Sequence, residues 1–299
     1  MNAANTKCVV AFGEVLWDCL PSGLFLGGAP LNVAYHAARL GAESYVASSV
    51  GKDLLGDEAF RRLEAAGIGT NLLKRHPRFP TGASVASLDD AGDATYDILE
   101  EVAWDEISLG EEDAEILVKA DALVYGSLAA RSRMNLDLLS GLLERTQAVK
   151  VCDVNLRAPY DDPELALSLA RRADVIKVND DELEVLSGLS GDDLQGQVRA
   201  LGRLTGVGTI CVTLGKRGAL LWRDGKFLSE SAAEVETADT IGAGDSFTAA
   251  LCMGILHGYD LEECLRRAVR LSAFVASKSG AQPDYEAEEV LQPALQEGK

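Results

Sequence analysis

Short apolar runs alternate with helical stretches along most of the chain, and this alternation limits the fold more than any other feature. Residues 7–13 form a continuous apolar run, which is typical of a central strand buried on both faces. Strands joined through helices pair in parallel. Further strands are predicted at residues 44–50, 122–125, 149–154 and 175–178, with helices at 54–66, 111–119, 135–145 and 163–172. The pattern therefore predicts an α/β fold with a mostly parallel central sheet.

Two segments interrupt the alternation with β-prone sequence. Residues 14–26 contain short apolar pieces around a Pro-Ser-Gly turn, and residues 82–99 have the pattern of a hairpin. Together they predict a small sheet apart from the main one, which we expect to act as a lid over a cleft. Residues 209–222 predict two strands around a glycine turn, with a third strand after them, so one sheet edge should be antiparallel. We expect residues 1–299 to form a single domain.

Composition and charge exclude several classes of protein. The formal net charge of −19 opposes binding to nucleic acid or to an anionic membrane. Six cysteines lie far apart without a Cys-x-x-Cys pair, which favours reduced thiols over zinc ligands or disulfides. The first apolar run is too short for a signal peptide or a membrane span. We therefore expect a cytoplasmic protein.

A glycine turn leads into an apolar helix within residues 238–256. Gly242 and Gly244 allow the backbone to turn tightly, and the helix that follows offers N–H groups at its positive end. This pattern predicts an anion site. Asp245 stands where the turn meets the helix, and it is either a base beside a phosphate or simply an N-cap. A P-loop would need a lysine after the glycines and a dinucleotide fingerprint a small residue at Phe247, so both motifs are excluded.

Five residues lie at the carboxyl ends of predicted strands, where open α/β sheets bind ligands. These positions hold Gly126, Asn155, Arg157, Lys177 and Asn179. Glu182 stands three residues after Asn179, and taken alone this pair is typical of a helix capping box.

Glycine pairs mark two further turns. Residues 27–41 open with Gly27-Gly28 and predict one helix, and Asn32 in its opening turns either faces a polyol or is a surface or capping asparagine. His36 in the same helix is expected to be a packed surface residue rather than a ligand. Gly215 and Gly218 allow a ligand to approach closely, although hairpins use glycine as well.

Four motifs taken together resemble one family. They are Gly27-Gly28 with Asn32, Asn179-x-x-Glu182, Thr213-x-Gly215-x-x-Gly218 and Asp239-Thr240-Ile241-Gly242-Ala243-Gly244-Asp245. In this order and spacing the chain resembles the ribokinase-like family of carbohydrate kinases over nearly its whole length. Residues 13–18, 28–34, 126–128 and 153–157 look most like those of bacterial fructokinases. The resemblance implies a three-layer αβα sandwich with a small β-sheet lid.

The resemblance also implies a mechanism. Asp245 would take the proton from the terminal hydroxyl of a sugar. Backbone N–H groups of Gly242, Ala243 and Gly244 would stabilise the transferring phosphoryl group of ATP.

Binding roles follow from the same resemblance. The residues expected at the substrate are Asp18, Gly28, Asn32, Tyr96 and Arg157. Those expected at ATP are Lys177, Asn179, Thr213, Gly215 and Gly218. Mg²⁺ would be held through water by Glu182 and Asn179, and K⁺ would lie near Asp239, Ile241 and Gly280. We also expect a homodimer formed through the apolar face of the lid.

The sequence leaves more than one function open. The first is ATP-dependent phosphorylation of a ketose, D-fructose to fructose 6-phosphate. A kinase for 2-keto-3-deoxygluconate, or another sugar kinase of the family, would share the scaffold. A regulator without catalysis is opposed by the intact Asp245 and Glu182, and a dinucleotide-dependent dehydrogenase by the missing fingerprint.

Overall fold

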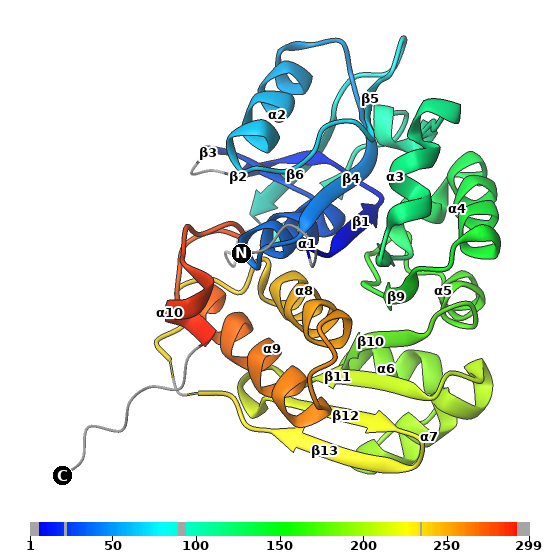
Figure 1. Ribbon diagram of the computed structural model, residues 1–299, viewed down its shortest axis with the longest axis vertical. Coiled ribbons are helices and arrows are strands. Elements are labelled where there is room, and N and C mark those ends of the chain that lie inside the picture. Colours follow the sequence, from blue (N-terminus) through cyan, green and yellow to red (C-terminus); the bar gives the residue numbers. More distant parts are fainter. Residues whose placement is uncertain (1–5, 21–22, 89–93, 234, 292–299) are drawn as a thin grey trace.

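The computed structural model describes residues 6–20, 23–88, 94–233 and 235–291, and Figure 1 shows helices on either side of a twisted sheet. Within these residues the central sheet has nine strands in the order β13-β12-β11-β10-β9-β8-β1-β4-β5. They are β1 (Cys8–Phe12), β4 (Glu43–Val50), β5 (Leu73–Arg75), β8 (Ala122–Tyr125), β9 (Val149–Asp153), β10 (Val175–Asn179), β11 (Thr209–Thr213), β12 (Ala219–Arg223) and β13 (Lys226–Glu230). Neighbouring strands are parallel except at the β11–β12–β13 edge, as predicted.

Strand β1 divides the hydrophobic core into two. Successive side chains of a strand point to opposite faces. Val9 and Ala11 therefore pack into one apolar cluster and Val10 and Phe12 into the other, all fully buried. This double burial explains why the first apolar run shows no polar alternation.

Helices cover both faces of the sheet and complete the three layers that were expected. One face carries α1 (Ala29–Arg39), α2 (Leu54–Ala65), α8 (Ala243–Leu256) and α9 (Leu261–Ala276), with α10 (Ala287–Leu291) beside α9. The other face carries α3 (Ala114–Lys119), α4 (Arg133–Arg145), α5 (Pro163–Ala170), α6 (Asp180–Ser187) and α7 (Leu194–Thr205).

The two β-prone interruptions meet in a second sheet, as predicted. Its strands, in the order β3-β2-β6-β7, are β2 (Leu16–Leu20), β3 (Gly23–Gly27), β6 (Gly82–Leu88) and β7 (Ala94–Ile98). Strands β2 and β6 pair in parallel, while β2–β3 and β6–β7 are antiparallel. The turn predicted at 89–93 lies outside the described residues.

Arg131 fastens the end of this small sheet to the body of the protein. Its guanidinium group lies over the rings of Trp104 and Tyr160, 4.0 and 4.4 Å from their centroids, and donates to Leu99 O at 2.7 Å. It also pairs with Asp105 at 2.8 Å. Stacking and a charge-assisted hydrogen bond therefore fix the point at which β7 leaves the small sheet.

Two details of the predicted helices differ. Helix α7 was not predicted, because Gly196 and Gly202 weaken its helical pattern. The helix expected at 111–119 begins as a 3₁₀ turn, Glu111–Asp113, before α3.

The expectation that His36 is a surface residue was wrong. Helix α1 packs between the sheet and α8, so His36 is fully buried. Its ring nitrogens lie 2.9 Å from the Tyr285 hydroxyl and 2.9 Å from Ala281 O. Burial lowers the pKa of His36 to about 4, so the ring is neutral and links α1 to the segment that follows α9.

All six cysteines lie within the described residues, and none forms a disulfide. Five are buried, and Cys19 on β2 is partly exposed. Among the helices that the structure describes, none has the length and apolar character needed to cross a bilayer.

Candidate active site

A cleft of about 1290 Å³ lies along the carboxyl ends of β1, β9, β10 and β11 and reaches the small sheet. It brings together most of the predicted site residues. Those that line it are Asp18, Gly28, Asn32, Arg157, Lys177, Asn179, Glu182, Thr213, Gly215, Gly218, Ile241, Gly242, Ala243, Gly244 and Asp245. Asp239 and Gly280 are not in this lining, and the side chain of Tyr96 lies outside the described part of the structure.

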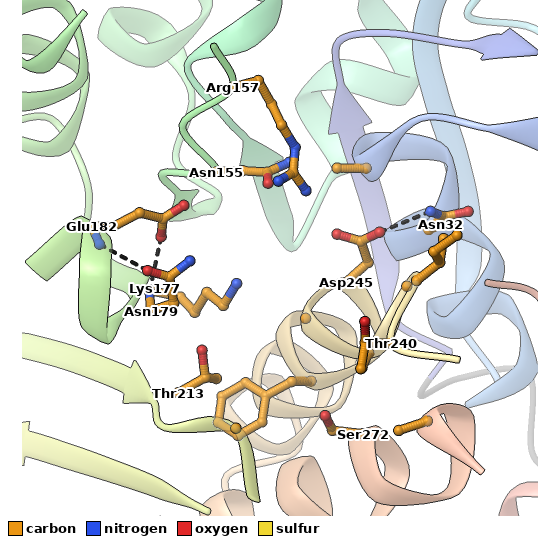
Figure 2. A pocket seen from close by; sticks show the side chains of 18 of the residues that line it. Asn32, Asn155, Arg157, Lys177, Asn179, Glu182, Thr213, Thr240, Asp245 and Ser272 are labelled. Carbon is orange, nitrogen blue, oxygen red and sulfur yellow. Dashed lines mark hydrogen bonds between the residues drawn. The ribbon is translucent and has the colours of Figure 1, made fainter. Parts of the chain in front are cut away.

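Asp245 sits in the first turn of α8, directly after the glycine turn. The N-cap is Gly242, with φ 76°, and no side chain among the described residues caps this helix. A Cβ atom at Gly242 would lie 2.5 Å from Ala281 Cβ, so the turn requires glycine. The N-cap interpretation of Asp245 is therefore wrong. Its carboxylate instead accepts a hydrogen bond from Asn32 Nδ2 at 2.8 Å (Figure 2).

Gln282 orients this pair from the far side. Its Nε2 donates to Asn32 Oδ1 at 2.8 Å, so the Asn32 amide is fixed with its N–H groups toward Asp245. Sequence reasoning missed Gln282, which stands 250 residues after Asn32. Asn32 is buried, so this chain of hydrogen bonds holds the Asp245 carboxylate in one orientation.

The environment of Asp245 raises its pKa to about 6. Solvent reaches the side chain through the cleft, but protein surrounds it closely on the other sides, and this burial is the largest cause. The charge of Asp153 raises the pKa further, while Asn32, Lys177 and Arg157 lower it. The carboxyl group therefore titrates close to neutral pH.

Glu14 is a second buried carboxyl group at the cleft that sequence reasoning did not select. It follows β1, is 4% exposed and accepts a hydrogen bond from Ala29 N at 3.2 Å. Burial raises its pKa to about 7, and the charge of Asp245 adds to the shift. A Cβ atom at Gly28 would lie 2.3 Å from Glu14 O, so the close fit of these two segments requires that glycine. The position of Glu14 directly after a predicted strand was the signal that could have identified it from the sequence.

Asp18 on β2 brings a third carboxyl group from the small sheet. Burial raises its pKa to about 6, and Arg157 opposes the shift. Arg157 is exposed and points into the space between the two sides of the cleft (Figure 2). Beside it, Asn155 has a left-handed backbone with φ 47°, which is uncommon outside glycine and frequent at functional sites.

Asn179 and Glu182 form the capping box that their spacing predicts. Asn179 Oδ1 accepts from Glu182 N, and Glu182 Oε2 accepts from Asn179 N, both at 2.8 Å. Glu182 Oε1 accepts a third bond from Leu156 N at 2.9 Å. Both residues also line the cleft, so capping does not exclude a ligand role. Burial raises the pKa of Glu182, and Lys177 opposes the shift.

The other end of the cleft is made by the antiparallel edge and α9. Gly218 has φ 94°, and a Cβ atom there would lie 1.9 Å from Glu230 O. Small and apolar side chains line the space between this edge and the helix, namely Ala232, Ala233, Val235, Ala273 and Ala276.

The Asp239 carboxylate connects the loop that contains Ile241 to the loop that contains Gly280. Its carboxylate accepts from Ile241 N at 3.0 Å and from Gly280 N at 3.2 Å. Within the described residues, no group of three or more His, Cys, Asp or Glu side chains could hold a metal ion.

Comparison with known proteins gives a consistent family. The pfkB family carbohydrate kinase description matches residues 13–288. Fructokinase-1 of Oryza sativa subsp. japonica is 32% identical over 325 residues, which cover 97% of this chain and 98% of the relative. A deoxyribokinase of Salmonella typhi is 29% identical over 266 residues, covering 87% and 84%.

A solved structure described as a ribokinase II from E. coli, in complex with ATP and Mg²⁺, has the same fold. Its TM-score is 0.82 at 22% identity, and the match covers 92% of this chain and 94% of that one.

The raised pKa of Asp245 predicts that the Asp245→Asn variant becomes more stable relative to the wild type as the pH rises. The pKa lies above the usual 3.8, so the stability that this group contributes is complete below about pH 4 and lost as pH rises through about 6. Asparagine avoids this loss. Urea unfolding should show the advantage of the variant growing by about 1 kcal/mol between about pH 5 and pH 7.5. A difference in unfolding free energy between variant and wild type that does not change with pH would contradict the raised pKa of Asp245.

Proposed function

The chain belongs to the pfkB family of carbohydrate kinases, and on that basis we propose that it transfers the γ-phosphoryl group of ATP to the terminal hydroxyl group of a ketose. One observation carries this proposal. The carboxylate of Asp245, oriented by Asn32, lies directly after the Gly242–Gly244 turn at the positive end of α8. A base and an anion site therefore stand side by side, as phosphoryl transfer to a hydroxyl group requires.

The proposed steps use this geometry. Asp245 takes the hydroxyl proton as the oxygen attacks the γ-phosphorus, and the bond from the γ-phosphorus to the bridging oxygen breaks to release ADP. Backbone N–H groups of Gly242, Ala243 and Gly244, together with Lys177 and Arg157, stabilise the charge on the phosphoryl group. The sugar is bound by Asp18, Gly28 and Asn32. Tyr96 is a further proposed contact of the sugar. Phosphoryl transfer needs little covalent help, so positioning supplies most of the acceleration.

D-fructose is the sugar that we propose, with fructose 6-phosphate as the product. The fructokinase relative, at 32% identity over nearly the whole chain, supports this choice. The deoxyribokinase relative supports the alternative of another sugar, and a 2-keto-3-deoxygluconate kinase remains the second candidate. An ATPase-coupled screen over about a dozen sugars distinguishes them.

Oxygen donors at the cleft fit Mg²⁺ held through water. The carboxylate oxygens of Glu182 already accept backbone N–H groups, which favours an outer-sphere role for Glu182 and Asn179. Bound Mg²⁺ would neutralise charge on the ATP phosphates. The nucleotide itself would lie against Thr213, Gly215 and Gly218. We also propose K⁺ near Asp239, Ile241 and Gly280, whose loops are joined by the Asp239 carboxylate.

The arrangement of the small sheet supports its role as a lid on a single kinase domain. Leu16, Asp18 and Ile98 face the cleft, while Leu24 and Phe25 on β3 are 51% and 41% exposed. These exposed side chains support a homodimer formed through the lid. Reduced cysteines and a dependence on ATP support a cytoplasmic location.

Replacing the base should abolish turnover without unfolding the protein. We expect Asp245→Asn to lower kcat by about 10²–10⁴-fold, because the shape is kept and the proton acceptor is lost. Turnover with ATP and fructose, ATP affinity and melting temperature are the measurements. Asp57→Asn is the matched control, since Asp57 also lies in the first turn of a helix but away from the cleft. Normal turnover by Asp245→Asn would refute the proposal.

Glu182→Gln should raise the Mg²⁺ concentration needed for half-maximal activity more than it raises KM for the sugar. The change removes the charge that would hold the hydrated ion. A Mg²⁺ titration of the variant tests this, with the exposed Glu184→Gln on the same helix as the control. A lower melting temperature with an unchanged titration would leave Glu182 with its capping role alone.

Sugar binding should slow hydrogen exchange in the small sheet. Closure over the cleft would protect the backbone amides of β2 and β6. Exchange is measured with and without fructose, with β5 at the far edge of the central sheet as an internal reference. Equal exchange of β2 and β6 in both states would count against a lid.

A further inference from the structure

Asp153, at the end of β9, links two elements that meet at the cleft. Its Oδ1 lies 3.0 Å from Lys177 Nζ on β10, and its Oδ2 accepts a hydrogen bond from Thr248 Oγ at 2.6 Å on α8. Asp153 and Lys177 are 5% and 6% exposed, and Thr248 is fully buried. One carboxylate thus joins β10 to the helix that carries Asp245.

This contact determines where the Lys177 ammonium group lies. A Cβ atom on Gly244 would be 3.1 Å from Lys177 Nζ, so the ammonium group lies beside Gly244 of the glycine turn. In Figure 2, Lys177 extends from β10 toward the middle of the cleft. A lysine side chain has four rotatable bonds, so its ammonium group stays at one point only where another group holds it. Asp153 is the group that does so.

The charges around Lys177 support the same conclusion. Burial would lower its pKa, but Asp153, Glu182 and Asp245 together raise it. Lys177 is therefore a buried cation among carboxylates, and only Asp153 among these three holds it by a hydrogen bond in the described structure. A buried charge without a fixed partner is costly, so the pair keeps the cation in place.

Building on the function proposed above, we propose that Asp153 is a positioning residue for phosphoryl transfer, which holds the Lys177 ammonium group beside Gly244 with the support of Thr248. A cation at this point would act together with the N–H groups at the start of α8 on the charge that develops on the phosphoryl group. The alternative is an ion pair that only stabilises the fold, like Lys74–Asp113, in which the buried Asp113 lies 2.6 Å from Lys74 Nζ, away from the cleft.

The test is a double-mutant cycle on kcat with ATP and fructose, or with whichever sugar the screen identifies. Asp153→Asn and Lys177→Met should each lower kcat by about 10²-fold, because the cation is misplaced or removed, while KM for the sugar stays unchanged. The double variant should lose no more than Lys177→Met alone, since both changes remove one interaction. Asp113→Asn, the matched buried control, should melt earlier but keep its kcat.

Thr248→Val keeps the proposal testable if Asp153→Asn does not fold. It leaves the ion pair intact and removes one support, so kcat should fall by a smaller factor, and Thr248→Ser should restore it. Losses that multiply in the double variant, or a normal kcat in folded Asp153→Asn or Thr248→Val, would overturn the role given to Asp153. A wild-type chain that phosphorylates no sugar would instead overturn the proposed function, and with it this role.

Discussion

The carboxyl group of Asp245 lies in a site that protein closes on most sides, and the groups around it have opposed effects on its charge. Burial and the charge of Asp153 favour the neutral form, whereas Asn32, Lys177 and Arg157 favour the charged form. The positive end of α8 acts in the same direction as the cations. These opposed effects leave the pKa at about 6, which suits the role of proton acceptor near neutral pH that we propose for Asp245.

The topology supplies these groups from segments far apart in the chain. The carboxyl ends of the parallel strands β1, β9 and β10 lie on the same side of the sheet. Glu14, Asp153 and Asn179 are therefore brought near one another without long loops. Helix α1 packs against α8, which brings Asn32 to Asp245. A shift of strand register by one residue would turn these side chains to the other face of the sheet. The buried side chains of β1, which fix the register, therefore also fix the positions of the groups at the cleft.

The amino-acid sequence was sufficient to predict the central sheet except for β5, its antiparallel edge and the small sheet, because each depends on local periodicity or on glycine turns. Most of the cleft lining was predicted from the family resemblance. The sequence could not reveal contacts that close only in the folded chain. Gln282 bonds to Asn32, and His36 to Tyr285, across about 250 residues. Helix α7 was hidden by its glycines. For Glu182 the local pattern fits the capping box that the structure shows and equally the ligand role that we propose.

The burial of the cysteines has a practical consequence. Burial raises the pKa of Cys8 and Cys264 to about 11 and that of Cys211 and Cys252 to about 12, and it raises that of Cys152 as well. Thiols react with alkylating reagents as thiolates, so these five are poor targets. Cys19 on β2 is the one cysteine that is not buried. The small sheet therefore carries a native attachment point for a fluorophore or spin label, and its motion can be followed in the unaltered protein.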